Sequence, residues 1–545
     1  MGAIDVTNGD VVERHPALVA AGFYLALVAV LLGTSLAKTG GTFVYAQDDP
    51  YIHLTMARTL ADVGVWGIRP DAFASASSSP LWTLLLAAFA AAGIRVVWWP
   101  FVLNVVAGLG VVWIGDRVLQ TSLAPRSRLA ALAAIIVVAP LPTLALIGME
   151  HSLQLAVAVA FVWSFIRLMT ADGARHLGAA AGLAALLVAT RYEGLFVVAA
   201  AFVVLVWNRR WKAGAVVLVA ALVPVAAFGA FSLTHGGSVL PNSILMKSHP
   251  ARFASLGSTV ASMIADTASV VALYQRPAEL VLTLVVGLAL FARSAHDTAD
   301  GRGAAAVAVT FVGAELLHSA FVKLEWFYRY EAYLMVLGVL SLALLWSSDD
   351  GVRDRARSLK ENVGGRFVLA MLALPLVVRA MSAVGETPLA MKNVFEQQYQ
   401  MGLFFGQELG DAPIALNDIG AVSWLTAAPI VDVYGLATQR VADLKRQDRW
   451  DAREVDALVS SRGVRAVAMY ECALAPLIPA SWTLVGEWQI RDNVAVSGET
   501  VGFFAPTPAD VDRLQRALER FAPRLPPGVG WRAPRPSASR YECSP

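Results

Sequence analysis

Long apolar runs fill most of the first 384 residues, and the residues after them alternate between apolar and charged positions. A helix of about 20 apolar residues crosses the hydrocarbon core of a bilayer. We therefore predict a polytopic α-helical membrane domain at residues 1–384, followed by an extracytoplasmic α/β soluble domain at residues 385–545. The eleven expected spans are 17–37, 98–116, 128–147, 152–168, 175–190, 193–208, 213–233, 278–292, 304–321, 331–346 and 367–383.

The first apolar run, Ala17–Leu36, ends in a possible cleavage site at Ser35-Leu36-Ala37. The apolar core of a signal peptide is usually only about 7–15 residues long. Because this run is longer, we expect an uncleaved first span.

A second apolar stretch, Leu81–Ala92 between Pro80 and Gly93, is too short to span comfortably, and we interpret it as an interfacial or re-entrant helix. If it does not cross, the basic loops all fall on the side of Arg14, which is then cytoplasmic because short cytoplasmic loops collect Lys and Arg. The loops at 38–97, 148–152, 191–193, 234–277 and 322–330, and everything after residue 384, then lie outside. The basic residues concerned are Arg117, Arg126, Arg128, Arg167, Arg175, Arg209, Arg210, Lys212, Arg293, Arg302, Arg353, Arg355, Arg357, Lys360 and Arg366.

Composition agrees with a multi-pass protein of the cell (inner) membrane. Apolar residues make up 57% of the chain and charged residues 15%, whereas soluble domains have about 45–50% and about 25%. The net charge is +2, and nucleic-acid binding has no support because the basic residues lie mostly in short cytoplasmic loops. No P-loop, Rossmann glycine string, metal-spaced Cys/His cluster or Gly-x-Ser-x-Gly elbow occurs in a fitting context, which disfavours nucleotide-driven pumping and zinc chemistry.

Two adjacent carboxylates, Asp48 and Asp49, directly follow the first span. Carboxylates at the membrane surface are costly unless they are solvated, paired or used. The amphipathic pattern of Ile52–Val63 places them at the start of an interfacial helix. In a transfer reaction such a carboxylate can take the proton of an attacking sugar hydroxyl. The alternative is a helix cap at Asp49 with a solvated neighbour.

Further polar side chains gather in the loops predicted to be external. Arg191, Lys247 and Arg329 could form a cationic pocket for a phosphate or pyrophosphate. The other members could bind a sugar or an acceptor, although interfacial aromatic and charged residues are also ordinary membrane anchors. These other candidates are His53, Glu150, His151, Tyr192, Glu193, Asn242, His249, Glu325, Trp326 and Tyr330.

This arrangement suits a lipid-phosphate sugar, and four sequence strings together with the acidic pair resemble the GT-C superfamily of polyprenyl-phosphate-sugar glycosyltransferases. Over about residues 15–440, the chain is most similar to the mycobacterial terminal arabinofuranosyltransferases that finish the cell-wall arabinan. The strings are Ser79-Pro80-Leu81-Trp82, Gly148-Met149-Glu150, Thr190-Arg191-Tyr192-Glu193-Gly194 and Leu240-Pro241-Asn242-Ser243.

The resemblance implies an inverting transfer from decaprenyl-phosphate arabinofuranose, or another polyprenyl-phosphate sugar, to a cell-envelope glycan at the outer face of the membrane. Asp48 would be the general base, with Asp49 second. The chain departs from the family pattern at Tyr192, where Arg-Pro-Glu is usual, and at Ser243, where Asn-Thr is usual. Some members use a divalent metal at the acidic residue. The chain shows no obvious further carboxylate ligands, so no cofactor is expected and a divalent metal stays an alternative.

The last part of the chain predicts an α/β fold, with helices at 395–409, 451–461 and 509–521, strands at 413–416, 429–434 and 464–470, and a meander at 482–504. Asn417-Asp418-Ile419-Gly420-Ala421 follows a strand, where Asp and Gly are more often turn formers than site residues. The domain should help to position a polymeric acceptor, or else serve as a lid over the loops.

Both cysteines of the chain, Cys472 and Cys543, lie in this domain. Extracytoplasmic compartments are oxidising, so we predict one disulfide between them.

Two other classes of function stay open. A transporter or lipid flippase often shows repeated halves with midplane charges, but we find no convincing internal repeat. A scaffold subunit would tolerate loss of the acidic pair. Within the glycosyltransferase class, mannose or another pentose would use the same residue types.

Overall fold

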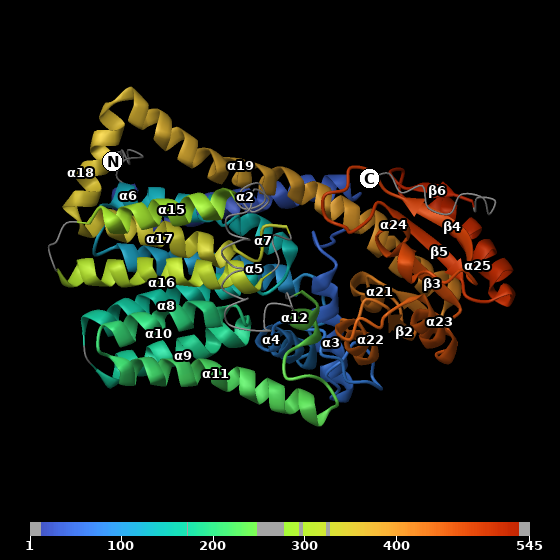
Figure 1. Ribbon diagram of the computed structural model, residues 1–545. Helices are drawn as coiled ribbons and strands as arrows, with labels where there is room; N and C mark the ends of the chain where they lie inside the picture. The colour runs from blue at the N-terminus through green and yellow to red at the C-terminus, as the bar shows by residue number, and fades with distance from the viewer. Residues whose placement is uncertain (1–11, 172, 248–276, 294–297, 323–326, 534–545) are drawn as a thin grey trace, which may run out of the picture.

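The computed structural model describes residues 12–171, 173–247, 277–293, 298–322 and 327–533. A bundle of helices forms one lobe, and a sheet with its covering helices forms the other (Figure 1). Each predicted span coincides with a helix or a helix pair. These are α2 (Pro16–Lys38), α5 (Trp99–Leu119), α6 (Pro125–Val138) with α7 (Leu141–Ile147), α8 (His151–Thr170), α9 (Ala174–Thr190), α10 (Gly194–Trp207), α11 (Trp211–Thr234), α15 (Pro277–Phe291), α16 (Ala299–Phe321), α17 (Ala332–Ser348) and α19 (Val363–Val394).

The described residues contain fewer full-length spans than the eleven predicted. Seven helices are long and apolar enough to cross a membrane, or eight if α17 is joined across a 101° bend to α18 (Asp350–Glu361). Helices α9, α10 and α15 have 17, 14 and 15 residues. At 1.5 Å per residue they are shorter than a hydrocarbon core of about 30 Å. They nevertheless lie within the same bundle as the longer helices (Figure 1), and the chain is a multi-pass membrane protein.

Two helices of the first loop lie at the end of the bundle that faces the sheet (Figure 1). They are α3 (Asp49–Val63) and α4 (Pro80–Ala91), which pack against each other. The hydroxyl of Ser79 accepts the backbone N–H of Trp82 at 3.2 Å and so caps α4. At 12 residues, α4 confirms the prediction of a short apolar helix in the first loop.

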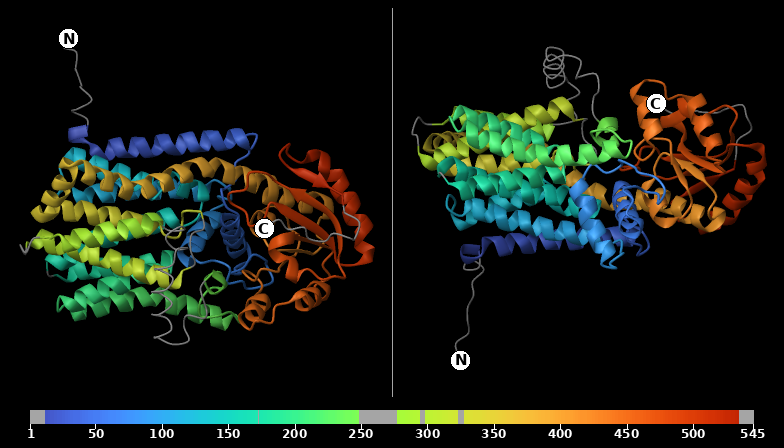
Figure 2. Two further views of the ribbon diagram at one scale, coloured as in Figure 1. Left: turned by 45° about the horizontal axis from the view of Figure 1, so that its top comes forward. Right: turned by 90° about the horizontal axis from the view of Figure 1, so that it is seen from below.

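The longest helix joins the two lobes. Helix α19 continues through a π-helical turn (Phe395–Tyr399), α20 (Gln400–Phe404) and a second π-helical turn (Phe405–Leu409). The predicted domain boundary at residue 384 therefore falls inside one helix, because the composition changes there while the helix goes on. In Figure 2, α19 lies beside α2 along the outside of the bundle.

The second lobe is built on a six-stranded sheet in the order β2-β1-β3-β5-β4-β6, where β1 pairs in parallel with β2 and β3 and the other pairs are antiparallel. The α/β prediction is confirmed for every element it named. Helices α22 and α23 contribute to the core on one face of the sheet, and α20 and α25 to the core on the other. The strands are β1 (Ile414–Leu416), β2 (Ile430–Asp432), β3 (Ala466–Tyr470), β4 (Thr483–Gln489), β5 (Thr500–Ala505) and β6 (Gly530–Arg532), and the helices are α21 (Gly420–Leu425), α22 (Gln439–Arg446), α23 (Ala452–Ser461), α24 (Glu471–Leu474) and α25 (Pro508–Phe521).

Cys472 in α24 is disulfide-bonded, whereas its expected partner, Cys543, lies outside the described residues, so the pairing stays a prediction. Denatured, unreduced protein should show no reactive thiol, and reduction should release two. Two reactive thiols before reduction, in protein alkylated at harvest, would refute the disulfide.

Candidate active site

Asp48 joins the first loop to the sheet domain. Its two carboxylate oxygens accept the backbone N–H groups of Gly420 at 2.6 Å and Ala421 at 2.7 Å, at the start of α21. A side chain at position 420 would clash with the carbonyl oxygen and the carboxylate of Asp48. Glycine is therefore required for this close approach, and the acidic pair lies between the two lobes.

Gly420→Ala should separate α21 from Asp48 and lower the activity by at least about tenfold, because misplacing a catalytic group by 1 Å can cost about 100-fold. Gly385→Ala in α19 is a matched control, since a methyl group there meets nothing within 4 Å. The measurement is the initial rate of each variant in the transfer assay proposed below. Equal rates for both variants would show that the close contact between α21 and Asp48 does not affect the activity.

A second carboxylate, Asp418, faces Asp48 from the sheet domain. Asp418 accepts a hydrogen bond from Gln398 Nε2 at 2.9 Å and another from the hydroxyl of Tyr470. Burial, and next the negative charge of Asp418, raise the pKa of Asp48 well above its usual range, although the two backbone N–H groups oppose the shift. Burial likewise raises the pKa of Asp418. The two groups titrate as a pair and hold protons more tightly than ordinary aspartates.

Arg329 binds the other member of the acidic pair. Its Nη2 lies 2.8 Å from Asp49 Oδ2 and donates to the Tyr330 hydroxyl at 3.2 Å, while its Nη1 lies 2.8 Å from the sulfur of Met149. The guanidinium also lies over the Tyr330 ring, 5.0 Å from its centroid. The side chain is only 2% exposed, so Arg329 is a buried cation held at the acidic pair.

Arg191 also lies over the ring of Tyr330, 5.4 Å from its centroid. Its guanidinium pairs with Glu150 at 2.6 Å and with Glu193 at 2.5 Å. The two glutamates predicted to bind sugar thus hold this arginine in place. Arg191 and Arg329 both lie close to one tyrosine ring, whereas the side chain of Lys247, the third residue of the expected cationic pocket, lies outside the described part of the structure.

The remaining predicted residues have other surroundings. His53 is buried behind Glu150, with Nε2 3.8 Å from Glu150 Oε2, and His151 is buried with its ring 6.3 Å from that of Tyr330. Lys247 ends α12 (Asn242–Lys247). His249, Glu325 and Trp326 lie outside the described residues.

Asn242 connects the lobes. Its Nδ2 donates to Gln439 Oε1 at 3.0 Å and to the Leu436 carbonyl at 3.5 Å, and its backbone N–H donates to the Ser75 carbonyl at 3.0 Å. These contacts make Asn242 a link between an external loop and α22, a role that the sequence did not suggest.

Two cavities meet at Tyr330, which lines both. An apolar cavity of about 350 Å³ has Arg191 in its wall together with Tyr192, Phe196, Ile244 and Leu245. A second cavity of about 390 Å³ lies between the lobes, and we call it the polar cavity because more polar side chains line it than line the first. Its lining includes Asp48, Asp49, Arg329, Gln398, Asp418, Tyr434 and Tyr470.

Among the described residues, no group of three His, Cys, Asp or Glu side chains is placed to hold a metal ion. We therefore do not assign Asp48, Asp49 or Asp418 as a metal ligand. A divalent metal stays the alternative to a reaction without a cofactor.

The bundle, the short helices of the first loop and the sheet domain together form a fold of the GT-C type. ArnT from Cupriavidus metallidurans has a similar structure both bound to undecaprenyl phosphate (TM-score 0.50) and in the apo state (TM-score 0.51). In each comparison the identity is 13%, over 90% of this chain and 99% of ArnT. This likeness concerns the fold.

Other comparisons add little about activity. The arabinofuranosyltransferase AftD from Mycobacteria gives a TM-score of 0.42 and 12% identity, over 89% of this chain and 41% of AftD, which is too distant to bear on the sugar. Residues 392–504 match a family described as a domain of unknown function, DUF8728. No curated protein matches the chain.

Sequence reasoning underrated the sheet domain's share of the site. Asn417–Ala421 was interpreted as a turn, yet it carries Asp418 and the two N–H groups that bind Asp48. Gln398 and Tyr470 were not considered as site residues. A strand followed by Asn-Asp was the only local signal, since the partner residues lie far away in the chain.

Proposed function

We propose that this protein is an inverting glycosyltransferase that moves a sugar from a polyprenyl-phosphate donor to a glycan acceptor. The observation that carries the proposal is the meeting of an apolar and a polar cavity at Tyr330, next to Arg329 and the acidic pair. A polyprenyl chain suits the apolar cavity, its phosphate suits the two arginines, and its sugar suits the polar cavity.

Buried polar atoms of residues that line the two cavities support a bound ligand. Arg329 Nε and the hydroxyls of Tyr192 and Ser243 have no hydrogen-bond partner in the part of the chain that the structure describes. Leaving such a group unsatisfied costs about 1–3 kcal/mol. A phosphate oxygen would accept from all three kinds of donor. That ArnT binds undecaprenyl phosphate supports the same class of donor.

The reaction is a single displacement. Asp48 accepts the proton of the acceptor hydroxyl as its oxygen forms a bond to the anomeric carbon. The bond from that carbon to the phosphate oxygen breaks, and the phosphate leaves with the electron pair. Arg329 and Arg191 stabilise the charge that develops on the phosphate. A raised pKa suits Asp48 for this role, because a general base works best when its pKa lies near the working pH.

The finer identity of the substrates follows the sequence resemblance. We favour decaprenyl-phosphate arabinofuranose as donor and a cell-wall arabinan as acceptor, on the strength of the motifs around Glu150, Arg191 and Asn242. Mannose and other pentoses remain alternatives, since hydroxyl-binding carboxylates and amides suit all of them.

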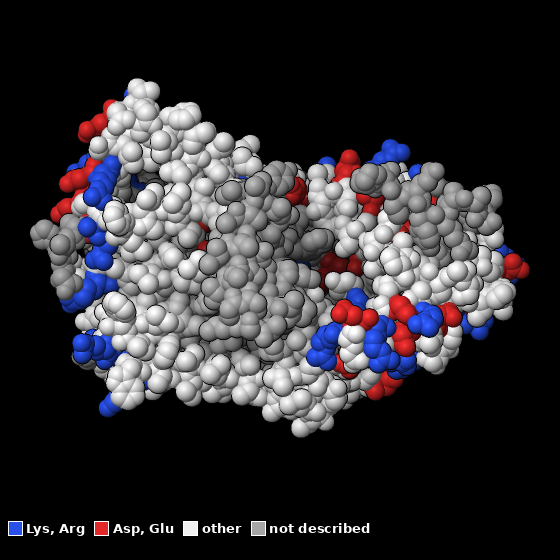
Figure 3. Space-filling view, viewed as in Figure 1, with Lys and Arg blue, Asp and Glu red and all other residues white. Residues whose placement is uncertain are grey.

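The charge distribution supports the proposed orientation. On the face shown in Figure 3, Lys and Arg, with some Asp and Glu, gather at the end of the bundle far from the sheet domain, and the described surface of the bundle next to them is mostly uncharged. Short cytoplasmic loops collect such residues. We therefore place the chain in the inner membrane with residues 12–14 at the cytoplasmic face and the cavities and sheet domain outside.

Purified protein offered a panel of polyprenyl-phosphate sugars with oligosaccharide acceptors tests this function. We expect transfer from one lipid-phosphate sugar and none from the same sugar on a nucleotide diphosphate. A flippase would move the lipid across proteoliposomes without changing it. Absence of any transfer by protein that binds polyprenyl phosphate would contradict the proposal.

A further inference from the structure

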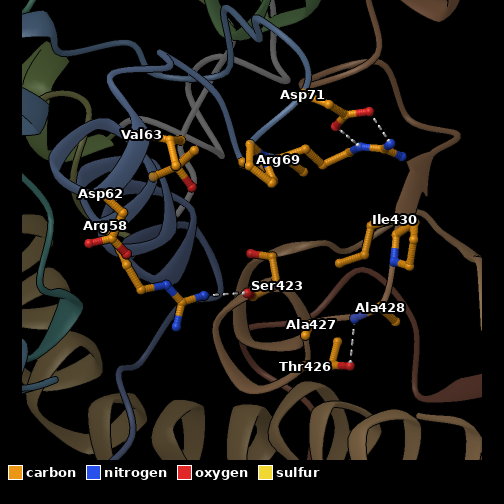
Figure 4. A pocket seen from close by; sticks show the side chains of 14 residues that line it. Arg58, Asp62, Val63, Arg69, Asp71, Ser423, Thr426, Ala427, Ala428 and Ile430 are labelled. Atoms are coloured by element: carbon orange, nitrogen blue, oxygen red, sulfur yellow. Dashed lines mark hydrogen bonds and ion pairs between the residues drawn. The ribbon is translucent and has the colours of Figure 1, made fainter. Parts of the chain in front are cut away.

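A separate groove of about 470 Å³ lies at the far end of α3, outside both cavities described above. Figure 4 shows its walls: Arg58 and Asp62 of α3 on one side, Arg69 and Asp71 on another, and the segment after α21 opposite them. Grooves of this size between domains are common ligand sites. We propose that it binds the acceptor glycan at sugar units distant from the reacting end, an inference that rests on the proposed function.

The walls of the groove are held in place by the protein itself. Arg58 donates to the carbonyls of Ser423 at 3.1 Å and Trp424 at 3.3 Å, and its guanidinium lies 4.7 Å from the centroid of the Trp424 ring. Arg69 makes a two-pronged pair with Asp71, at 2.9 and 2.6 Å. A preformed site loses little entropy when it binds.

The turn that carries Arg69 is also fixed by the backbone. Gly64 ends α3 with a φ of 72°, and the Ala74 N–H donates to the Trp66 carbonyl at 2.8 Å. A side chain at Gly67 would clash with the Ala72 carbonyl. The Arg69–Asp71 pair is thus presented on a tight, closed loop.

The charges of the groove favour a neutral ligand. Its lining holds two arginines and two aspartates. Asp71 pairs with Arg69, and Asp62 pairs at 2.5 Å with Arg95, which lies outside the lining. The lining therefore has no excess of positive charge that would attract a phosphate and no excess of negative charge that would attract a cation. Guanidinium donors, carboxylate acceptors and the hydroxyls of Thr59 and Thr426 together match the mixed donors and acceptors of a sugar chain.

The position of the groove suits binding of the same glycan chain whose end reaches the active site. Arg58 lies nine residues along α3 from Asp49, which is about 14 Å at 1.5 Å per residue. The groove touches Ile430 at the start of β2, whereas Tyr434 beyond the end of β2 lines the polar cavity. A few sugar units span a separation of this size, which suits an acceptor whose reacting end is at the acidic pair and whose more distant units are in the groove.

Binding and kinetics of Arg69→Ala test the groove. Neutral linear hexasaccharides of arabinose, mannose and glucose, and the matching disaccharides, serve as probes in calorimetry. We expect at least one hexasaccharide to bind wild-type protein, and to bind Arg69→Ala about tenfold more weakly, as expected for loss of one hydrogen bond to a charged group. In transfer assays KM for the long acceptor should rise about tenfold while kcat and the disaccharide KM stay unchanged.

Arg453→Ala is the matched control, because Arg453 pairs with Asp451 at the same two-residue spacing on the surface of the sheet domain. It should behave as wild type. Asp71→Asn, which keeps the shape of the side chain, should weaken binding as Arg69→Ala does. The proposal that the groove binds the acceptor would be overturned if no hexasaccharide binds, or if Arg69→Ala binds it as tightly as wild type does. It would also be overturned if KM rises as much for disaccharides as for the long acceptor. Binding without any transfer would instead refute the proposed function alone.

Discussion

Asp48→Asn should lower kcat by at least about 100-fold, since general-base catalysis contributes about 10²–10⁴. The amide cannot take the proton of the acceptor hydroxyl, whereas its oxygen can still accept one backbone N–H of α21. Affinity for the polyprenyl-phosphate sugar should stay within about twofold, because the phosphate is assigned to Arg329 and Arg191. Single-turnover rates and donor binding by fluorescence or calorimetry measure the two effects separately.

Asp451→Asn is the matched control, because Asp451 also occupies a helix N-cap and accepts backbone N–H groups, in its case from Arg453 and Glu454 at 3.0 Å. Its activity should equal that of wild type. Asp49→Asn should instead weaken donor binding, because it removes the ion pair that holds Arg329. Normal transfer by Asp48→Asn, with loss in Asp49→Asn, would reverse the roles assigned to the two residues.

The pH profile adds a second test of Asp48. Its base form is needed for transfer, and burial with the nearby charge of Asp418 raises its pKa. The rate should therefore rise with pH through a range well above the ordinary aspartate pKa of about 4. Asp418→Asn removes the neighbouring charge and should move this rise to lower pH. A profile that is flat down to pH 4.5 would rule out a perturbed aspartate as the base.

Arg379→Met should destabilise the protein by about 3–5 kcal/mol, the usual effect of removing one partner from a buried ion pair. Arg379 in α19 lies 2.6 Å from Glu331 and 3.3 Å from Glu279, and all three side chains are buried. Its Nη2 also donates to the Tyr328 carbonyl at 3.1 Å. The substitution leaves two carboxylates in the bundle without this cation.

The same variant should also weaken donor binding, because the contacts of Arg379 flank Arg329 and Tyr330. Phe327 and Tyr328 have φ angles of 56° and 60°, a strained conformation that persists only where surrounding contacts hold it. Unfolding in lipid nanodiscs measures stability, and polyprenyl-phosphate binding below the unfolding range measures the site. Arg366→Met, at an exposed position of the same helix, should change neither. Unchanged stability of Arg379→Met would show that the ion pairs contribute little.

The sequence predicted correctly those features that depend on a single segment of the chain. The lengths of the apolar runs located the helices of the bundle. Asp48 and Asp49 were singled out because two carboxylates next to a membrane span are costly unless they are solvated, paired or used. Helices α9, α10 and α15 form where the apolar runs predicted them and pack within the bundle, although they are shorter than the longest spans. The change of composition at residue 384 was taken as a boundary, although α19 continues through it.

Contacts between distant segments could not be predicted. Asp48 and Gly420 are 372 positions apart, and neither carries a local sign of the other. Gly148 is part of one of the sequence strings, but a tertiary contact explains why this position is glycine. It has a φ of 76°, and a side chain there would clash with the ring of Tyr45. Asn242 likewise looked like a sugar ligand until its bonds to Gln439 and Leu436 placed it between the lobes.

The most direct test of the central claim is a cryo-EM structure of the protein in nanodiscs with undecaprenyl phosphate. The account predicts the lipid in the apolar cavity and its phosphate within hydrogen-bond distance of Arg329, next to Tyr330 and on the same side as Asp48. A phosphate bound elsewhere, such as at the basic end of the bundle far from the sheet domain, would contradict it.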